Sequence, residues 1–204
     1  MVGAEQDPRA APGRRRIPLV HLVVLGSFAL LVAPFLRPAH PDCAGRVTQA
    51  LDRDEAATSA EVLRTCRREL ARYTRESDAT GWAEIQLGVG TLLAESGEHA
   101  QATDAHRQAL LVFTRESNPR CWASIHYAIA RLLLVQAKRT PAAASYRSAL
   151  AELDPGSSEA ELARRGLQET EAARGLGKAD VRVLQGGLGS AQEWSDLLTT
   201  CRGT

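Results

Sequence analysis

The side chains of this chain that are suited to metal or redox chemistry are four cysteines and five histidines. No two cysteines form a CxxC pair, the spacing typical of zinc and thiol redox sites. The histidines show no HExxH or comparable spacing. The sequence therefore predicts no metal site and no cofactor. The residues concerned are Cys43, Cys66, Cys121, Cys201, His21, His40, His99, His106 and His126.

Motifs for catalysis are also missing from the sequence. It contains no GxSxG, no P-loop and no paired-carboxylate signature. The glycine-rich GGLGS at 186–190 lacks the lysine of a phosphate-binding loop, so we interpret it as a hinge. The net charge of +1 provides no field that would hold nucleic acid. We expect no enzymatic activity, no catalytic residue and no nucleic-acid partner.

Disulfide formation is the chemistry that the cysteine positions favour. Cys43 and Cys66 lie almost symmetrically about a turn near 54–57. Residues equidistant from the turn of an antiparallel helical hairpin face each other, which predicts a Cys43–Cys66 bond. Elimination leaves Cys121–Cys201, which would tie the tail to the last repeat. Pairing is favoured outside the cytosol, whereas in the cytosol four reduced cysteines would serve as small core residues.

An apolar stretch near the N-terminus predicts a membrane anchor. Residues 17–36 carry no charge and follow Arg14, Arg15 and Arg16. Twenty residues at about 1.5 Å per residue span about 30 Å, the thickness of the hydrocarbon core of a bilayer. The positive-inside rule then keeps the basic segment 1–16 in the cytosol. We expect a single-pass protein whose linker, 37–42, leads to an extracytoplasmic domain, periplasmic or extracellular.

A cleaved secretory signal is the competing interpretation. The segment between Pro18 and Pro34 is short enough for a signal sequence. Its cleavage sites are poor, because Pro34 follows Ala33, and Arg37 lies where a small residue is needed before Ala39. The sequence therefore favours an uncleaved anchor.

The centre of the chain repeats with a period of 40 residues. YTRES at 73–77 returns as FTRES at 113–117, and Trp82-Ala83 returns as Trp122-Ala123. Residues 67–73 match part of a further, incomplete copy. A fixed period of this length is typical of stacked structural repeats.

Each repeat contains two helical patterns. Apolar residues follow one another at steps of three and four, first over 82–93 and then over 102–113, and Gly97 suits the turn between them. Capping signals are expected at Thr58, Thr140 and Ser158. These patterns predict an all-α fold, a short α-solenoid of helical hairpins.

These repeats resemble the tetratricopeptide repeat (TPR) family, in a longer variant of its unit. The small residues, the turn glycine and the Ala-Leu pair fall at Gly90, Gly97, Ala102 and Ala109-Leu110. The next copy has Ala137 in place of the turn glycine, and its unit ends in Leu153-Asp154-Pro155. The resemblance covers about 43–173, including a capping helix. In the tail, 174–204, AQEWSDLLTTC is expected to form a final helix that folds back or binds a partner.

The resemblance implies a concave peptide-binding face lined by the first helix of each unit. Leu87 and Thr91 replace the Lys and Asn of the family's clamp for C-terminal carboxylates, so that clamp is not expected. Tyr127 and Arg131 are the expected anchors of a mixed groove, since Tyr and Arg often dominate interface energy. The implied face consists of Glu84, Leu87, Thr91, Glu95, Ser124, Tyr127, Arg131 and Leu134.

The sequence thus predicts a membrane-anchored scaffold that binds a protein or peptide. A secreted repeat protein and a structural accessory subunit of an envelope or secretion complex are the alternatives. The repeated pairs Arg75-Glu76 and Arg115-Glu116 form either a functional surface or local ion pairs.

Overall fold

The computed structural model describes residues 43–53, 56–172 and 190–202. The predicted anchor at 17–36, with the segments 1–16 and 37–42, lies outside the described residues. Within the described ranges the chain forms eight helices and no strand, which confirms the all-α class. No helix in these ranges has the length and apolar character needed to cross a membrane. The helices are α2 (Cys43–Arg53), α3 (Ala56–Leu70), α4 (Ala79–Glu95), α5 (His99–Ala109), α6 (Pro119–Val135), α7 (Arg139–Leu150), α8 (Ser158–Ala172) and α10 (Ala191–Arg202).

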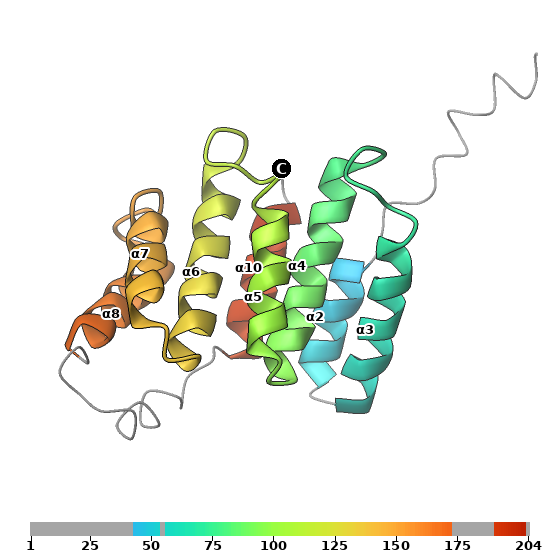
Figure 1. Ribbon diagram of the computed structural model, residues 1–204, viewed down its shortest axis with the longest axis horizontal. Coiled ribbons are helices and arrows are strands. Elements are labelled where there is room, and N and C mark those ends of the chain that lie inside the picture. The colour runs from blue at the N-terminus through green and yellow to red at the C-terminus, as the bar shows by residue number, and fades with distance from the viewer. Residues whose placement is uncertain (1–42, 54–55, 173–189, 203–204) are drawn as a thin grey trace, which may run out of the picture. The chain divides into compact units, whose positions relative to one another are not determined.

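Consecutive helices from α2 to α8 pack against one another, and the C-terminal helix α10 returns to contact α2, α4 and α6 (Figure 1). The hairpin of α4 and α5 is followed by the equivalent hairpin of α6 and α7. Both α4 and α6 have 17 residues, and each boundary of α6 lies 40 positions after that of α4. The period in the sequence is therefore a period in the structure.

The repeated TRES segment is a hydrogen-bonded connector that starts the next helix. The backbone N–H of Thr74 donates to Oγ of Ser77 at 3.0 Å, and the N–H of Ser77 donates to Oγ1 of Thr74 at 3.2 Å. Thr114 and Ser117 form the same two bonds at the same distances. The following residue, Asp78, caps α4 by accepting from the N–H of Gly81 at 2.9 Å. Asn118 caps α6 in the same way through Cys121.

The turns inside the two hairpins share one geometry despite different residues. Gly97 has a φ of 82° and Ala137 a φ of 58°, both in the left-handed region. Around Ala137, the N–H of Lys138 donates to the carbonyl of Leu133 at 2.9 Å, as expected for a Schellman turn. Ala137 therefore adopts a conformation that favours glycine.

Several expected helix boundaries are wrong by a few residues. Helix α5 ends at Ala109, and Phe113 is buried in the turn that follows rather than in the helix. Thr58 lies inside α3. Thr140 lies inside α7, because this helix restarts directly after the Schellman turn of α6. The cap of α8 is Ser157, whose Oγ accepts from the N–H of Ala160 at 3.1 Å.

A disulfide joins α2 to α3 through Cys43 and Cys66, the pair expected from their symmetry about the turn. Both residues are fully buried. Helix α4 approaches this bond through Gly88, where an added Cβ would lie 2.8 Å from Sγ of Cys43. The bond thus forms part of the contact between α2 and α4.

Replacing Ala137 by glycine should stabilise the protein. An alanine in the left-handed region is strained by about 1–2 kcal/mol, and glycine removes this strain. Glycine also raises the conformational entropy of the unfolded chain, which offsets part of the gain. We expect the free energy of unfolding to rise by about 0.5–1 kcal/mol in chemical denaturation. Gly97→Ala is the matched control and should lower it; an Ala137→Gly variant less stable than the parent would contradict the assignment.

Candidate functional site

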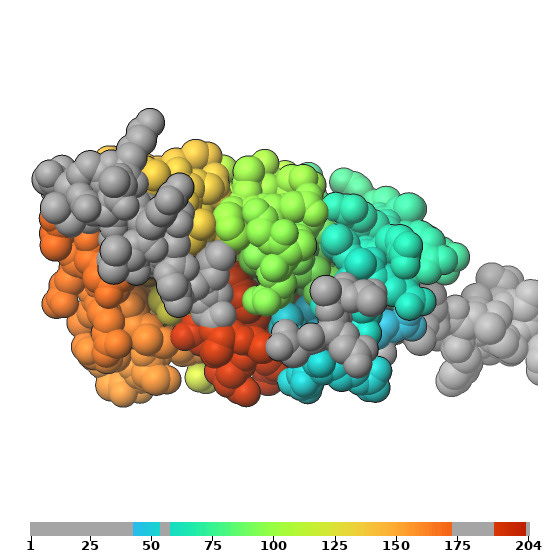
Figure 2. Space-filling model, turned by 90° about the horizontal axis from the view of Figure 1, so that it is seen from below, coloured from blue at the N-terminus to red at the C-terminus, as the bar shows by residue number. Residues whose placement is uncertain are grey.

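The C-terminal helix α10 contacts α4 and α6, the two helices that carry the residues of the expected binding face. It packs against α2, α4 and α6, and Figure 2 shows it on the face of the molecule between α2 and α8. Its buried residues are Trp194, Leu197, Leu198 and Cys201, one stripe at helical spacing. The tail of the chain therefore folds back onto the repeats.

The residues of the implied concave face are largely covered in this arrangement. Tyr127 and Arg131 are half-buried, and Glu95 is exposed. Helices α4 and α6, which carry all eight residues, are both in contact with α10. Five of the eight residues are thus buried within the domain, and Ser124, Tyr127 and Arg131 border a pocket together with residues of α10. The buried residues are Glu84, Leu87, Thr91, Ser124 and Leu134.

Arg131, an expected anchor for a partner, binds α10 instead. Its guanidinium forms an ion pair with Glu193, 62 residues away in the sequence. It also donates to Oη of Tyr127 at 3.3 Å and lies 5.4 Å from the centroid of that ring. Only 11% of the Arg131 side chain is exposed, so this pair is shielded from solvent far better than an ordinary surface pair. Glu193 therefore fixes the N-terminal half of α10 against α6.

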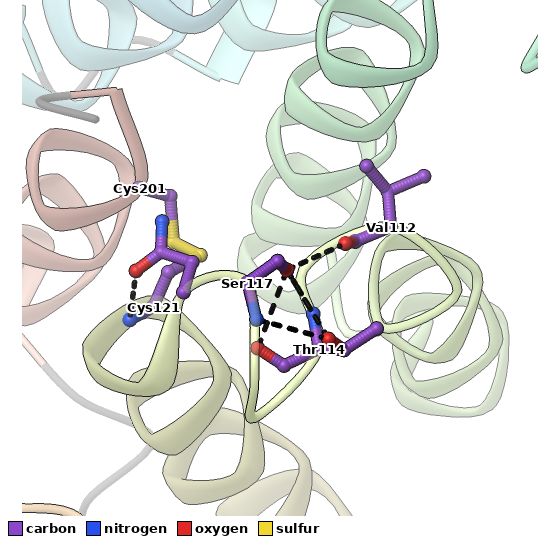
Figure 3. The surroundings of a disulfide bond; sticks show 6 residues. Val112, Thr114, Ser117, Cys121 and Cys201 are labelled. Atoms are coloured by element: carbon purple, nitrogen blue, oxygen red, sulfur yellow. Dashed lines mark hydrogen bonds between the residues drawn. A yellow bond between two sulfur atoms is a disulfide. The ribbon is translucent and has the colours of Figure 1, made fainter.

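A disulfide fixes the other end of α10. Cys121 in the first turn of α6 is bonded to Cys201 in the last turn of α10, 80 positions later (Figure 3). The TRES connector lies beside this bond, where Oγ of Ser117 donates to the carbonyl of Val112 at 3.1 Å. In chain-entropy terms, closing a loop of 80 residues contributes about 4.5 kcal/mol. Helix α10 is thus held covalently as well as by packing.

His106, on α5, contacts α10 through Trp194. Its ring meets that of Trp194 edge-on, with 5.9 Å between the centroids. Gly90 makes this possible, because a Cβ there would lie 2.1 Å from Nδ1 of His106. His106 is fully buried, and neither ring nitrogen has a hydrogen-bond partner among the described residues. Burial therefore lowers its pKa from 6.5 to about 4 and keeps the imidazole neutral.

A small pocket of about 60 Å³ remains open where α10 meets α6 and α8. Its α6 wall includes Ser124, Tyr127 and Arg131, and its α10 wall includes Glu193 and Trp194. Burial raises the pKa of Tyr127, and Arg131 partly offsets this. Both polar and aromatic groups thus border the pocket, but Arg131 is already paired within it.

Sequence reasoning did not identify Glu193 or the contact between His106 and Trp194. His106 shares its repeat position with Cys66 and Tyr146, and all three residues are buried. The signal for Glu193 was weak: an acidic residue next to the apolar stripe of a predicted tail helix. Nothing in a local pattern could pair it with Arg131.

Among the described residues, no group of three or more His, Cys, Asp or Glu side chains could hold a metal ion. No protein-family model, curated protein or solved structure matches the chain.

Acid should destabilise the protein through His106. Its pKa is about 4 when folded and about 6.5 when unfolded, so the unfolded state binds a proton first as the pH falls. Above pH 6.5, His106 is neutral in both states and the fold keeps its full stability. Below pH 6.5, this stability falls progressively toward pH 4, because protonation favours the unfolded state. At a pH of about 4.5 the loss should be roughly 2–3 kcal/mol.

The measurement is the free energy of unfolding at about pH 7.5 and about pH 4.5 for the parent and for His106→Gln. The variant should lose less stability on acidification, since every other titrating group is common to both proteins. Identical losses in the two proteins would show that His106 does not contribute.

Proposed function

We propose that this chain is a membrane-anchored, TPR-like binding module whose helical domain, 43–173, lies outside the cytosol. The observation that carries the proposal is the contact of α10 with α4 and α6, the helices that carry the residues of the implied concave face. This surface accepts an amphipathic helix through an apolar stripe and through one ion pair, Arg131–Glu193. Helix-in-groove recognition by a partner uses the same two elements.

The equivalence of the two hairpins supports the TPR-like solenoid. Helices α4 and α6 begin after the same connector, end in the same turn and carry the residues of the implied concave face. Two disulfides support the extracytoplasmic location, since such bonds persist in oxidising compartments. Anchoring rests on the sequence of 17–36 alone.

In this proposal α10 is a built-in ligand of the groove. With the Cys121–Cys201 bond formed, an external helix has to displace a tethered competitor at high effective concentration. The groove is thus closed in the oxidised protein and becomes available to a partner when α10 is undocked.

A structural accessory subunit is the second candidate, and the occupied groove favours it. A domain whose inner face is filled by its own tail can still assemble through its outer surface. Purification in a stable stoichiometric complex, with α10 remaining docked, would support this candidate over transient peptide binding.

The binding proposal is tested by emptying the groove in the full chain. Cys121→Ser and Cys201→Ser remove the covalent bond, and Leu197→Asp with Leu198→Asp prevents α10 from docking. A labelled peptide of residues 190–202, carrying Cys201→Ser, should then bind saturably in fluorescence anisotropy, because it restores the buried stripe. The parent with its disulfide intact should bind at least tenfold more weakly.

The matched control is the same peptide with both leucines replaced by aspartate, which should not bind. Circular dichroism checks that the emptied protein keeps its helices. Equal binding of the two peptides, or no binding by a folded, emptied protein, would contradict the groove as a helix receptor.

Location is tested by cell fractionation combined with thiol labelling. We expect the chain in the membrane fraction at full length, with all four cysteines protected until a reductant is added. Recovery in the soluble cytosolic fraction with four free thiols would refute the anchored, extracytoplasmic proposal. A shortened mature chain by intact mass would indicate the secreted alternative.

A further inference from the structure

The two copies of the TRES connector place their arginines in different surroundings. The hydrogen bonds between Thr and Ser are the same in both copies, so Arg75 and Arg115 leave equivalent backbones. Arg115 donates from Nε to Oε1 of Glu152 at 2.6 Å and lies 6.0 Å from the centroid of the Trp122 ring. The second copy is therefore a closed site: an arginine over a tryptophan, with a carboxylate bound.

The first copy has the arginine and the tryptophan but no carboxylate at the position of Glu152. Position 112, which corresponds to Glu152 after a shift of 40, is a valine. Arg75 lines an open hollow of about 350 Å³ together with Trp82. Among the residues that the structure describes, no carboxylate forms an ion pair with Arg75. Glu76 also lines the hollow, but it forms no ion pair with Arg75 among the described residues.

The hollow also has an apolar edge that the closed site lacks. Leu111 corresponds to Ala151, and it is the large apolar side chain that stands exposed within the described ranges, at 54%. Tyr73 and Leu70 complete the apolar wall. A single exposed leucine is common on protein surfaces; the recognition chemistry of this hollow therefore comes from Arg75, whose guanidinium can bind a carboxylate bidentately.

We propose that this hollow, which we call the Arg75 site, binds a carboxylate side chain of a partner protein next to an apolar residue. The partner's Asp or Glu takes the position that Glu152 holds at Arg115, and its apolar neighbour covers Leu111. The inference deepens the proposed scaffold function by naming a surface and the chemistry of its partner. This surface is built from the connector, Leu111 after α5 and residues of α3, α4 and α5 that include Trp82, and no residue of α10 lines it.

The probe for this site is a peptide of residues 148–154, Ser-Ala-Leu-Ala-Glu-Leu-Asp, with both ends blocked. It carries the carboxylate that the second copy uses, with leucines on either side. Titration of the full, detergent-solubilised chain should shift the NMR signals of the Arg75 side chain and of the Trp82 indole. A peptide with Gln at the position of Glu152 should bind at least fivefold more weakly.

Two variants of the protein test whether the Arg75 guanidinium itself recognises the carboxylate. Arg75→Gln should lose the preference for the acidic peptide, because the guanidinium is gone. Val112→Glu should lose binding as well, since it supplies the missing carboxylate from within the chain. Arg67→Gln, an arginine outside the hollow, is the control and should bind like the parent.

The site is refuted if Glu and Gln peptides bind alike, if the parent shows no saturable binding at Arg75, or if Arg75→Gln binds like the parent. These outcomes leave the peptide test at the groove and the location test unaffected, because neither involves Arg75. A negative result in the groove test would likewise not affect a positive result at the Arg75 site.

Discussion

The docking of α10 against α2, α4 and α6 is the contact on which the core of this domain depends. Helix α4 is buried on nearly all sides, as shown by residues as different as Ile85, Leu87 and Val89. A helix that is apolar all round requires neighbours on every face. Helices α3 and α5 cover part of α4, and α2 with α10 covers much of the rest. Without α10, the apolar inner surface of so short a stack would be exposed to water. Each Å² of apolar surface left exposed costs about 25 cal/mol of stability.

Both helices that close this inner surface are attached by disulfides. Helix α2 is bonded to α3 through Cys43 and Cys66, and α10 is bonded to α6 through Cys121 and Cys201. All four cysteines are buried members of the same hydrophobic core, so the bonds reinforce contacts that packing also makes. They lower the entropy of the unfolded chain most for α10, whose loop of 80 residues is the longer one. The covalent attachment of α2 and α10 therefore depends on both disulfides staying oxidised.

The sequence predicted the hairpins well because their determinants are local. Amphipathic stripes, the left-handed turn at Gly97 and the 40-residue register all act within one unit. Exact helix starts were less predictable, because neighbouring residues are equally good caps. Helix α7 begins directly after a Schellman turn rather than at Thr140, and Ser157 rather than Ser158 caps α8. The ion pair that holds α10 against α6 could not be predicted from the sequence, because Arg131 and Glu193 are 62 positions apart and no periodicity connects them. The face implied by the resemblance was an open one, and burial of Thr91 and Ser124 depends on tertiary packing.

The divergence between the copies indicates where a partner would be recognised while α10 stays docked. Identical connectors should bury identical amounts of surface, yet Glu152 and Ala151 complete one copy, whereas Val112 and Leu111 leave the other open. Val112 packs against the core, whereas Leu111 stays 54% exposed, so the first copy exchanges the carboxylate for apolar contacts and leaves Arg75 without that partner. A closed groove and an open arginine site fit a division of roles: the inner face holds the domain together, and the connector side is left for another protein. Comparison of the two copies thus shows what the first one lacks: the carboxylate that Glu152 provides to Arg115 in the second.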